Sequence, residues 1–505
     1  MENDDSRTSN VRRNALWSVG STVALAVASF AVRTVFIRVL SAEYLGVNGL
    51  FTNILAILSF SELGIGTAIN YALYRPISTG DELQIKALMG LFRNAYRIIA
   101  AAVLILGLLV VPLLPYLAKS TIPISEITIY YLVFLATTVS SYFVVYRTSY
   151  VTAAQHGYIV TNASAAGQIA TYIVQIAVLL ITKDFLVYLV VAFVVGVLKN
   201  VILSIYIGQK YPIVKSKQII EIDEKTKDEI KTNVGALVIH KIGDVGVHQS
   251  DNIIVSMFVN TAAVGLLSNY TMVTTLITKL TNSLFGSVTA SLGNLFASEG
   301  FERRRAVFDE YDMLGFILNC GILVFTSGII QPFITLWAGK RLLVDNVTVL
   351  LLLYTIFLQG MCTVVYQFKI ADGHYVEDRW IAFGQTLVNV VVSIAAIRAV
   401  GLPGVYIGTL VQRLLPVIVW PYITFKKVLG LPVRSYYCKF AFRCALAAAL
   451  SVAAWWVTGL ICPTVTIASF ILAAVVSLLL AIGPLMAIYG RTAAFHRLAK
   501  RFVRR

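Results

Sequence analysis

This sequence contains little charge for its length. Asp, Glu, Lys and Arg make up 13% of 505 residues, whereas soluble proteins carry about 25%. Hydrophobic residues reach 58% and mean hydropathy is +0.80, against about 45–50% apolar residues in soluble domains. This composition excludes a water-soluble globular protein and leaves almost no sequence for a separate soluble core.

Cysteine and the common catalytic motifs are also scarce or missing. The five cysteines lack CxxC or CxxH spacing, so neither a disulfide framework nor a zinc site is expected. The sequence has no G-x-x-x-x-G-K-[ST] phosphate loop, no H-E-x-x-H and no G-x-S-x-G. We therefore expect no enzymatic activity, no cofactor and no bound metal.

What the sequence does contain is a series of long apolar runs. A transmembrane helix needs about 20 such residues, and a barrel would instead show short alternating strands. We predict an all-α polytopic membrane protein with about 14 transmembrane helices. Hydropathy places them at residues 14–36, 46–73, 95–117, 127–148, 160–182, 185–208, 233–258, 262–295, 312–334, 346–370, 380–399, 403–425, 440–460 and 465–488.

The net charge of +16 follows from the predicted topology. With the amino terminus inside, alternate loops place roughly 30 of the 41 basic residues in the cytoplasm and about five outside. Both termini are therefore expected in the cytoplasm. Anionic lipid headgroups, and not nucleic acid, are the expected partners of this charge.

Two halves of the chain resemble each other. Near an offset of 219 residues, Asn14 matches Asn233 and Phe51 matches Tyr270, and near 217 Gln168 matches Gln385. Six spans separate the copies, which predicts two six-helix lobes in parallel orientation. The expected parts are a tail at 1–13, an N-lobe at 14–208, an amphipathic linker at 209–232, a C-lobe at 233–427, two carboxy-terminal helices at 428–490 and a basic tail at 491–505.

The first two spans carry opposite charges at membrane depth. Arg33 lies on the same helical face as Ser18, Thr22 and Ser29. Charges in spans usually face a cavity or a partner, and a guanidinium grips phosphate in bidentate fashion. Arg33 is therefore a candidate anion site, with an ion pair to Glu62 as the structural alternative. Glu62 is otherwise a candidate for ion coupling.

The seventh span carries a polar stripe. Helical spacing aligns the histidines and aspartates on one face, beside a lysine. Three interpretations of this stripe remain open: it lines a water-filled path, it takes up protons, or the segment partly leaves the membrane. A metal site is disfavoured because one helix presents only two neighbouring ligands. The residues of this stripe are His240, Lys241, Asp244, His248 and Asp251.

The remaining polar residues in spans are scattered. Lys279 and Arg413 add positive charge to the second half and are candidates for the same anion. Gln168 and Gln385 are candidates for sugar contacts, although such glutamines more often join helices. Lys199 is expected to extend toward the cytoplasmic surface.

The run Arg38-Val-Leu-Ser-Ala-Glu-Tyr-Leu-Gly-Val-Asn-Gly-Leu-Phe, followed by Phe60-Ser-Glu-Leu-Gly-Ile-Gly-Thr-Ala-Ile, resembles a known family. It is similar to the polysaccharide transporter branch of the MOP exporter superfamily, the Wzx-type flippases of lipid-linked oligosaccharides. Arg147 followed by Ala153-Ala154-Gln155 and the 14-span plan agree with this resemblance.

The resemblance implies two lobes around a cavity that opens alternately to either side. The implied cargo is an undecaprenyl-pyrophosphate-linked repeat unit for capsule, exopolysaccharide or O-antigen synthesis in the bacterial cytoplasmic membrane, with a polymerase and assembly proteins as possible partners. Arg33 is then the candidate residue for binding the pyrophosphate. Three alternatives remain: a MATE-like cation or drug antiporter, a polysaccharide polymerase and a purely structural role. The antiporter would favour carboxylates such as Asp244 and Asp251.

Overall fold

Helices form nearly all of the described chain. The computed structural model describes residues 20, 24–59, 65–215, 243, 246–247, 249–286, 289–374, 377–378, 380–492 and 495–497, and these residues contain no β-strand. Ten of the helices among them are long and apolar enough to cross a membrane. The predicted class, an all-α polytopic membrane protein, is therefore confirmed, whereas the total of 14 spans stays a prediction.

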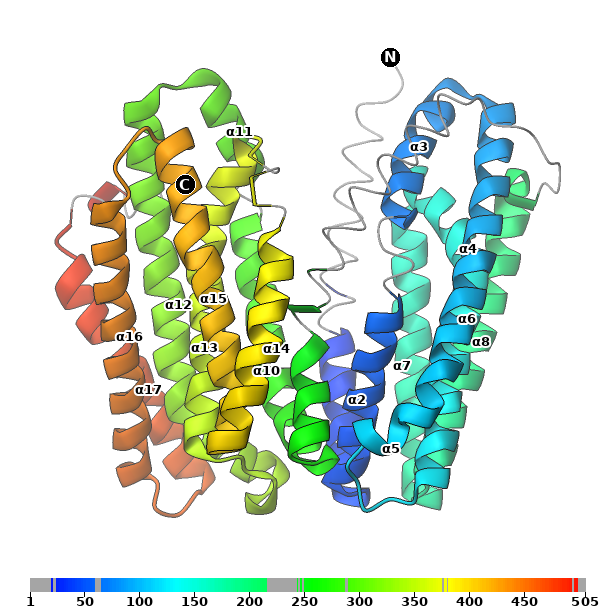
Figure 1. Ribbon diagram of the computed structural model, residues 1–505, viewed down its shortest axis with the longest axis horizontal. Helices are drawn as coiled ribbons and strands as arrows, with labels where there is room; N and C mark the ends of the chain where they lie inside the picture. The colour runs from blue at the N-terminus through cyan, green and yellow to red at the C-terminus, as the bar shows by residue number, and fades with distance from the viewer. Residues whose placement is uncertain are drawn as a thin grey trace. The chain divides into compact units, whose positions relative to one another are not determined.

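The chain divides into two compact units, Met1–Val264 and Gly265–Arg505. Within the first unit, α6 packs against α4, α7 and α8 (Figure 1). A helical segment at 24–39 precedes α2, and another at 249–258 lies close to the end of the unit. The elements between them are α2 (Ala42–Leu58), α3 (Ile65–Thr79), α4 (Glu82–Val110), η2 (Val111–Leu113), α5 (Leu114–Leu117), α6 (Ile124–Ala153), α7 (Gly157–Thr182), α8 (Phe185–Lys210) and η3 (Pro212–Lys215).

The second unit is built around α12. This helix packs against α13, α16 and α17, and α14 pairs closely with α15. Its elements are α10, which begins just before the division, α11, α12, η4, α13, α14, α15, the π-helical turn η5, α16 and α17. Their bounds are Thr261–Gly286, Thr289–Ser298, Phe301–Ala338, Lys340–Leu342, Asn346–Ala371, Ile381–Val400, Pro403–Ile423, Thr424–Val428, Arg434–Ile461 and Ile467–Tyr489.

Carboxylates at the loops determine where several helices begin. The side chain of Asp81 accepts a hydrogen bond from the Gln84 backbone N–H at 3.0 Å, and Asp184 accepts one from Leu186 at 2.6 Å. Each carboxylate satisfies an amide that has no partner within its helix. Because α4 begins at Glu82 and not at the predicted residue 95, its charged first turns extend beyond the apolar part that hydropathy detects.

The helices differ in how much of their apolar surface is covered. In α12, 61% of the most apolar stretch is buried, compared with 17% in α8. Helix α12 therefore forms the core of its unit, whereas α8 exposes apolar side chains such as Leu198, Val201 and Ile202. A helix that keeps apolar residues on its outer surface is suited to lipid and not to water.

Helices α2 and α10 begin 219 residues apart, at Ala42 and Thr261, which equals the offset of the sequence repeat. Their first turns touch: a Cβ at Gly46 would lie 1.8 Å from the backbone oxygen of Thr261. Only glycine permits this approach. The predicted lobes and linker stay predictions, since the linker beyond Lys215 lies outside the described residues.

Candidate functional site

A polar pocket lies inside the first unit, between α2, α6, α7 and α8. Its volume is about 300 Å³. Most of the residues that line it carry an amide or a hydroxyl group, which is unusual inside an apolar helix bundle and points to a polar ligand or water. The polar lining residues are Asn48, Thr137, Ser140, Ser141, Gln168, Thr171, Tyr172, Gln175, Tyr188, Lys199 and Asn200.

Arg33 lies beside this pocket. It belongs to the helical segment at 24–39, and its guanidinium lies near Tyr172 and Tyr188, which both line the pocket. Within the described part of the chain, no carboxylate forms an ion pair with Arg33. The structural alternative, a pair with Glu62, falls outside the described residues. Arg33 is thus a cation near two tyrosines of the pocket wall, although it does not itself line the pocket.

The structure brings two of the predicted site residues together. Gln168 lines the pocket from α7, and its side chain is within hydrogen-bonding reach of Tyr172, one turn further along the same helix. Tyr172 in turn lies near Arg33. A candidate sugar contact and a candidate phosphate contact therefore share one tyrosine.

Lys199 also lines this pocket, which the sequence did not reveal. It was expected to extend toward the cytoplasmic surface, but it is the fifteenth of the 26 residues of α8. Its stem packs against α7 at Gly167, where a Cβ would lie 2.5 Å from Lys199 Cδ. The side chain therefore lies along the neighbouring helix in the middle of the bundle. The position of Lys199 in the predicted span at 185–208, far from either end, is the feature of the sequence that could have indicated this.

The predicted site residues of the second unit do not gather in this way. Arg413 donates a hydrogen bond to Gln359 Oε1 at 3.2 Å, joining α15 to α13. Gln385 is buried in α14, whereas Lys279 is exposed on α10. No contact between described residues links these three side chains, and their roles stay predictions.

Most of the predicted polar stripe lies outside the described residues. This applies to His240, Lys241, Asp244 and His248, whereas Asp251 is described in the helical segment at 249–258 and is partly exposed. Among the residues that the structure describes, no group of three or more His, Cys, Asp or Glu side chains could hold a metal ion. The ion-coupling role of the stripe stays a prediction.

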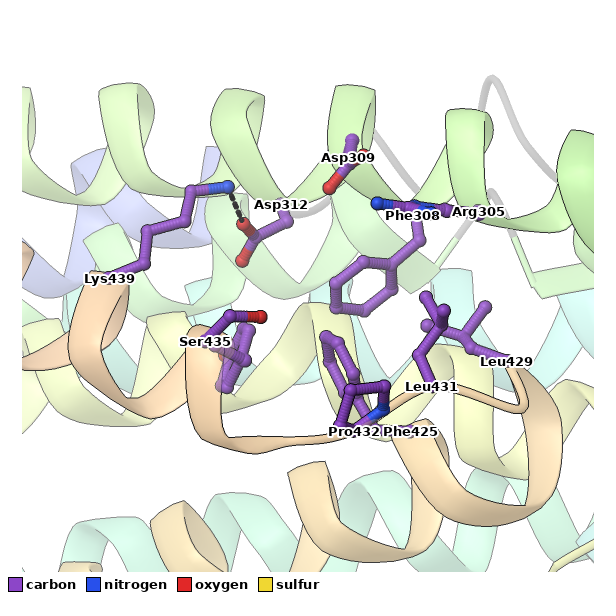
Figure 2. Close-up of a pocket in the computed structure, with 11 residues that line it drawn as sticks. Arg305, Phe308, Asp309, Asp312, Phe425, Leu429, Leu431, Pro432, Ser435 and Lys439 are labelled. Carbon is purple, nitrogen blue, oxygen red and sulfur yellow. Dashed lines mark hydrogen bonds and ion pairs between the residues drawn. The ribbon is translucent and has the colours of Figure 1, made fainter.

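A second pocket, of about 410 Å³, lies in the second unit between α12, η5 and the start of α16 (Figure 2). Its floor is apolar and includes Phe308 and Phe425, with Arg305, Asp309 and Lys439 around it. Asp312 at its edge accepts hydrogen bonds from Lys439 Nζ at 3.0 Å and, deeper in the protein, from Arg443 Nη1 at 2.7 Å. These ion pairs join α16 to α12.

The sequence analysis did not single out Asp312 or Glu310. Both are buried, and Glu310 Oε1 accepts a hydrogen bond from Arg497 Nε at 2.9 Å. Asp312 is the first residue of the span predicted at 312–334 and Glu310 lies two residues before it, where a flanking acidic residue is ordinary. Because α12 begins at Phe301, these carboxylates lie inside the helix and need cationic partners.

The turn between α13 and α14 contains a further charge cluster. Glu377 Oε1 accepts a hydrogen bond from Lys427 Nζ at 2.8 Å and lies 2.6 Å from His374 Nδ1. The Lys427 ammonium, together with a backbone amide and His374, lowers the pKa of Glu377 from 4.5 to about 2. Lys369 pairs with Asp378 in the same turn. The cluster attaches the turn to η5.

Comparison with known proteins agrees with the helical architecture. The family model described as polysaccharide biosynthesis protein matches residues 11–290. No curated protein matches the chain by sequence.

Several solved structures share the fold. Lipid II flippase MurJ in an inward closed conformation has a TM-score of 0.68 and 14% identity, covering 94% of this chain and 99% of its own. An inward-facing multidrug resistance MATE transporter of the MOP superfamily has a TM-score of 0.63 and 14% identity, with 79% and 93% covered. A MATE transporter from Vibrio cholerae has a TM-score of 0.54 and 15% identity, with 84% and 98% covered.

Proposed function

Because this chain belongs to the polysaccharide biosynthesis protein family, we propose that it is a flippase for an undecaprenyl-pyrophosphate-linked oligosaccharide. It moves the repeat unit from the inner to the outer leaflet of the bacterial cytoplasmic membrane by alternating access. The product serves capsule, exopolysaccharide or O-antigen synthesis, where a polymerase and assembly proteins receive it. Both termini lie in the cytoplasm.

The observation that supports this proposal is the position of Arg33 next to Tyr172 and Tyr188, two residues that line a pocket rich in polar side chains. A sugar pyrophosphate must cross about 30 Å of hydrocarbon, and this requires a polar, cationic surface within the helix bundle. Arg33 supplies a permanent positive charge beside Tyr172 and Tyr188. Its planar guanidinium can donate two parallel hydrogen bonds to phosphate oxygens.

The second contact in the proposal is to the sugars. Gln168 offers an amide that both donates and accepts hydrogen bonds, and its neighbour Tyr172 also lies near Arg33. A pyrophosphate held by Arg33 therefore places the first sugar close to Gln168. The lipid tail stays in the bilayer throughout.

A cation or drug antiporter is the second candidate, because MATE transporters share this fold. Such a protein needs a carboxylate that is open to its cargo. In the described part of the second unit, however, buried Asp312 is paired with Arg443 and Lys439, and buried Glu310 with Arg497. These pairs leave neither carboxylate available to a cation, whereas Asp251 stays a candidate. We favour the flippase because the family model that matches the chain is that of polysaccharide biosynthesis proteins.

A strain that lacks this chain tests the proposal. We expect a complete polyprenyl-pyrophosphate-linked repeat unit to accumulate, detected by mass spectrometry, and to be inaccessible to a glycan-modifying enzyme added outside. The wild-type gene should restore export. Arg33→Ala should lower the export rate about tenfold to a hundredfold, the range expected for one charge-assisted contact, and Arg33→Lys should restore part of it.

The matched control is Arg38→Ala, five residues further along and exposed. It should export at the wild-type rate. An accumulated unit that is accessible from outside would indicate a defect in polymerisation and contradict the proposal. Absence of any accumulated lipid-linked sugar would exclude this cargo.

A further inference from the structure

A lysine in the middle of the bundle has no polar partner among the residues that the structure describes. Lys199 lies about 21 Å along α8 from Phe185, at a rise of about 1.5 Å per residue. Among the described residues, its ammonium forms no ion pair and no hydrogen bond. A cationic side chain at this depth is costly and usually faces a cavity or a ligand pathway.

The neighbouring helix provides space for this side chain. At Gly167 of α7, a Cβ would lie 2.5 Å from Cδ and 2.6 Å from Cγ of Lys199, so any larger residue displaces the stem. Gly196, one turn before Lys199, adds open space on the pocket side of α8. The two glycines allow the lysine to extend along the pocket wall and not out toward lipid.

The rest of the lining suits hydroxyl groups. Ser140 and Thr171 already donate their hydroxyl protons to backbone carbonyls, at 2.8 Å in both cases, so toward the pocket they can only accept. The amides of Asn48 and Asn200 form no hydrogen bond with described residues and can both donate and accept. Sugar hydroxyls, which also donate and accept, match this combination.

The size and charge of the pocket restrict the ligand further. Pockets of about 300–1,000 Å³ hold small organic ligands, and this one, at about 300 Å³, lies at the lower end. A single ammonium matches a single negative charge, whereas a pyrophosphate carries several and is better matched by a guanidinium. Lys199 is therefore suited to a carboxylate.

We propose that this pocket binds an acidic sugar of the transported glycan and that Lys199 contacts the sugar carboxylate. The inference rests on the proposed function, since it takes the glycan of the lipid-linked cargo as the source of the sugar. It adds a substrate class: a repeat unit that carries a uronic acid. Lys199 and Gly167 then act together as determinants of specificity.

The test uses the purified full-length protein and two synthetic lipids. Both are undecaprenyl-pyrophosphate-linked disaccharides, one ending in glucuronate and the other in glucose. Flipping is measured in proteoliposomes, and equilibrium binding is measured on the detergent-solubilised protein. The variants are Lys199→Met, Lys199→Arg and Gly167→Ala, with Lys340→Met as an exposed lysine control and Gly483→Ala as a helical glycine control without neighbours.

We expect the wild type to bind and flip the glucuronate lipid more efficiently than the glucose lipid. Lys199→Met should weaken binding of the glucuronate lipid about tenfold to a hundredfold, the range for a charge-assisted hydrogen bond. Binding of the glucose lipid should change less than about twofold. Gly167→Ala should act in the same direction, Lys199→Arg should keep part of the preference, and both controls should behave as wild type.

The two proposals fail in different ways. If neither lipid is flipped but Lys199→Met still abolishes a binding preference for glucuronate, the flippase proposal is wrong and the pocket assignment stands. If both lipids are flipped and Lys199→Met affects them equally, or affects neither, the pocket does not recognise an acidic sugar. A wild type that binds both lipids equally also refutes the inference.

Discussion

Loss of the Asp312 carboxylate should destabilise the second unit strongly. Asp312 accepts hydrogen bonds from Arg443 at 2.7 Å and from Lys439 at 3.0 Å. The side chains of Asp312 and Arg443 are 2% and 1% exposed, whereas that of Lys439 is 42% exposed. Asp312→Asn preserves the shape of the side chain, removes its charge and replaces one acceptor oxygen with an NH2 donor.

The burial of the pair sets the magnitude. Breaking a buried ion pair by removing one partner costs about 3–5 kcal/mol, because the other charge remains buried without compensation. Arg443 also lies over the rings of Phe316 and Tyr489, with its Cζ 4.9 Å and 5.7 Å from their centroids, and this cation–π contact compensates only part of the loss. We expect Asp312→Asn to lower the free energy of unfolding by about 3 kcal/mol.

The assay is equilibrium unfolding in mixed micelles, followed by circular dichroism. Lys439→Met is the matched control and should cost at most about 1 kcal/mol, because its ammonium is largely exposed. The double variant Asp312→Asn/Arg443→Met should recover most of the loss, since no uncompensated charge remains. A double-mutant cycle then gives the coupling energy of the pair.

Two results would refute this reasoning. Equal costs for Asp312→Asn and Lys439→Met would show that burial does not govern the strength of these ion pairs. A double variant that is as unstable as the sum of its single variants would show that Asp312 and Arg443 do not act on each other.

Two further predictions follow from the packing and the charges. Gly46→Ala should lower the free energy of unfolding by at least about 1–3 kcal/mol, because its Cβ would lie 1.8 Å from the backbone oxygen of Thr261. The control, Gly49→Ala, should cost less, because its Cβ would lie 3.2 Å from Val264. Equal thermal melting temperatures for the two variants would contradict the contact at Gly46. Because the pKa of Glu377 is lowered from 4.5 to about 2, its interactions stabilise the fold above about pH 4.5 and are lost as the pH falls toward 2. The difference in unfolding free energy between wild type and Glu377→Gln should therefore shrink over that range, and a difference that is independent of pH would contradict the assignment.

The sequence predicted the fold class correctly because long apolar runs leave helices as the main option in a membrane. It also singled out Arg33 and Gln168, because isolated polar residues in apolar spans are conspicuous, and their roles stay predictions. It could not show that both lie near Tyr172, because the packing of α7 against the segment at 24–39 is a tertiary contact.

Lys199 shows why the remainder could not be predicted. Hydropathy evaluates a lysine only within its own span. The space that the Lys199 side chain occupies is provided by Gly167, which lies thirty-two residues earlier on another helix. Asp312 was missed for a related reason: the apolar run does not reveal that α12 already begins at Phe301. Helix ends and partners on other helices depend on packing, which periodicity within one span does not encode.

The most direct test of the central claim is flipping by the purified protein. A labelled undecaprenyl-pyrophosphate-linked oligosaccharide is placed in one leaflet of proteoliposomes, and its appearance in the other leaflet is followed with an impermeant glycan-modifying enzyme. The account predicts flipping that depends on the protein, saturates with lipid and is about tenfold to a hundredfold slower with Arg33→Ala. Vesicles that flip no more lipid than protein-free vesicles, yet exchange a cationic drug across the membrane, would contradict it.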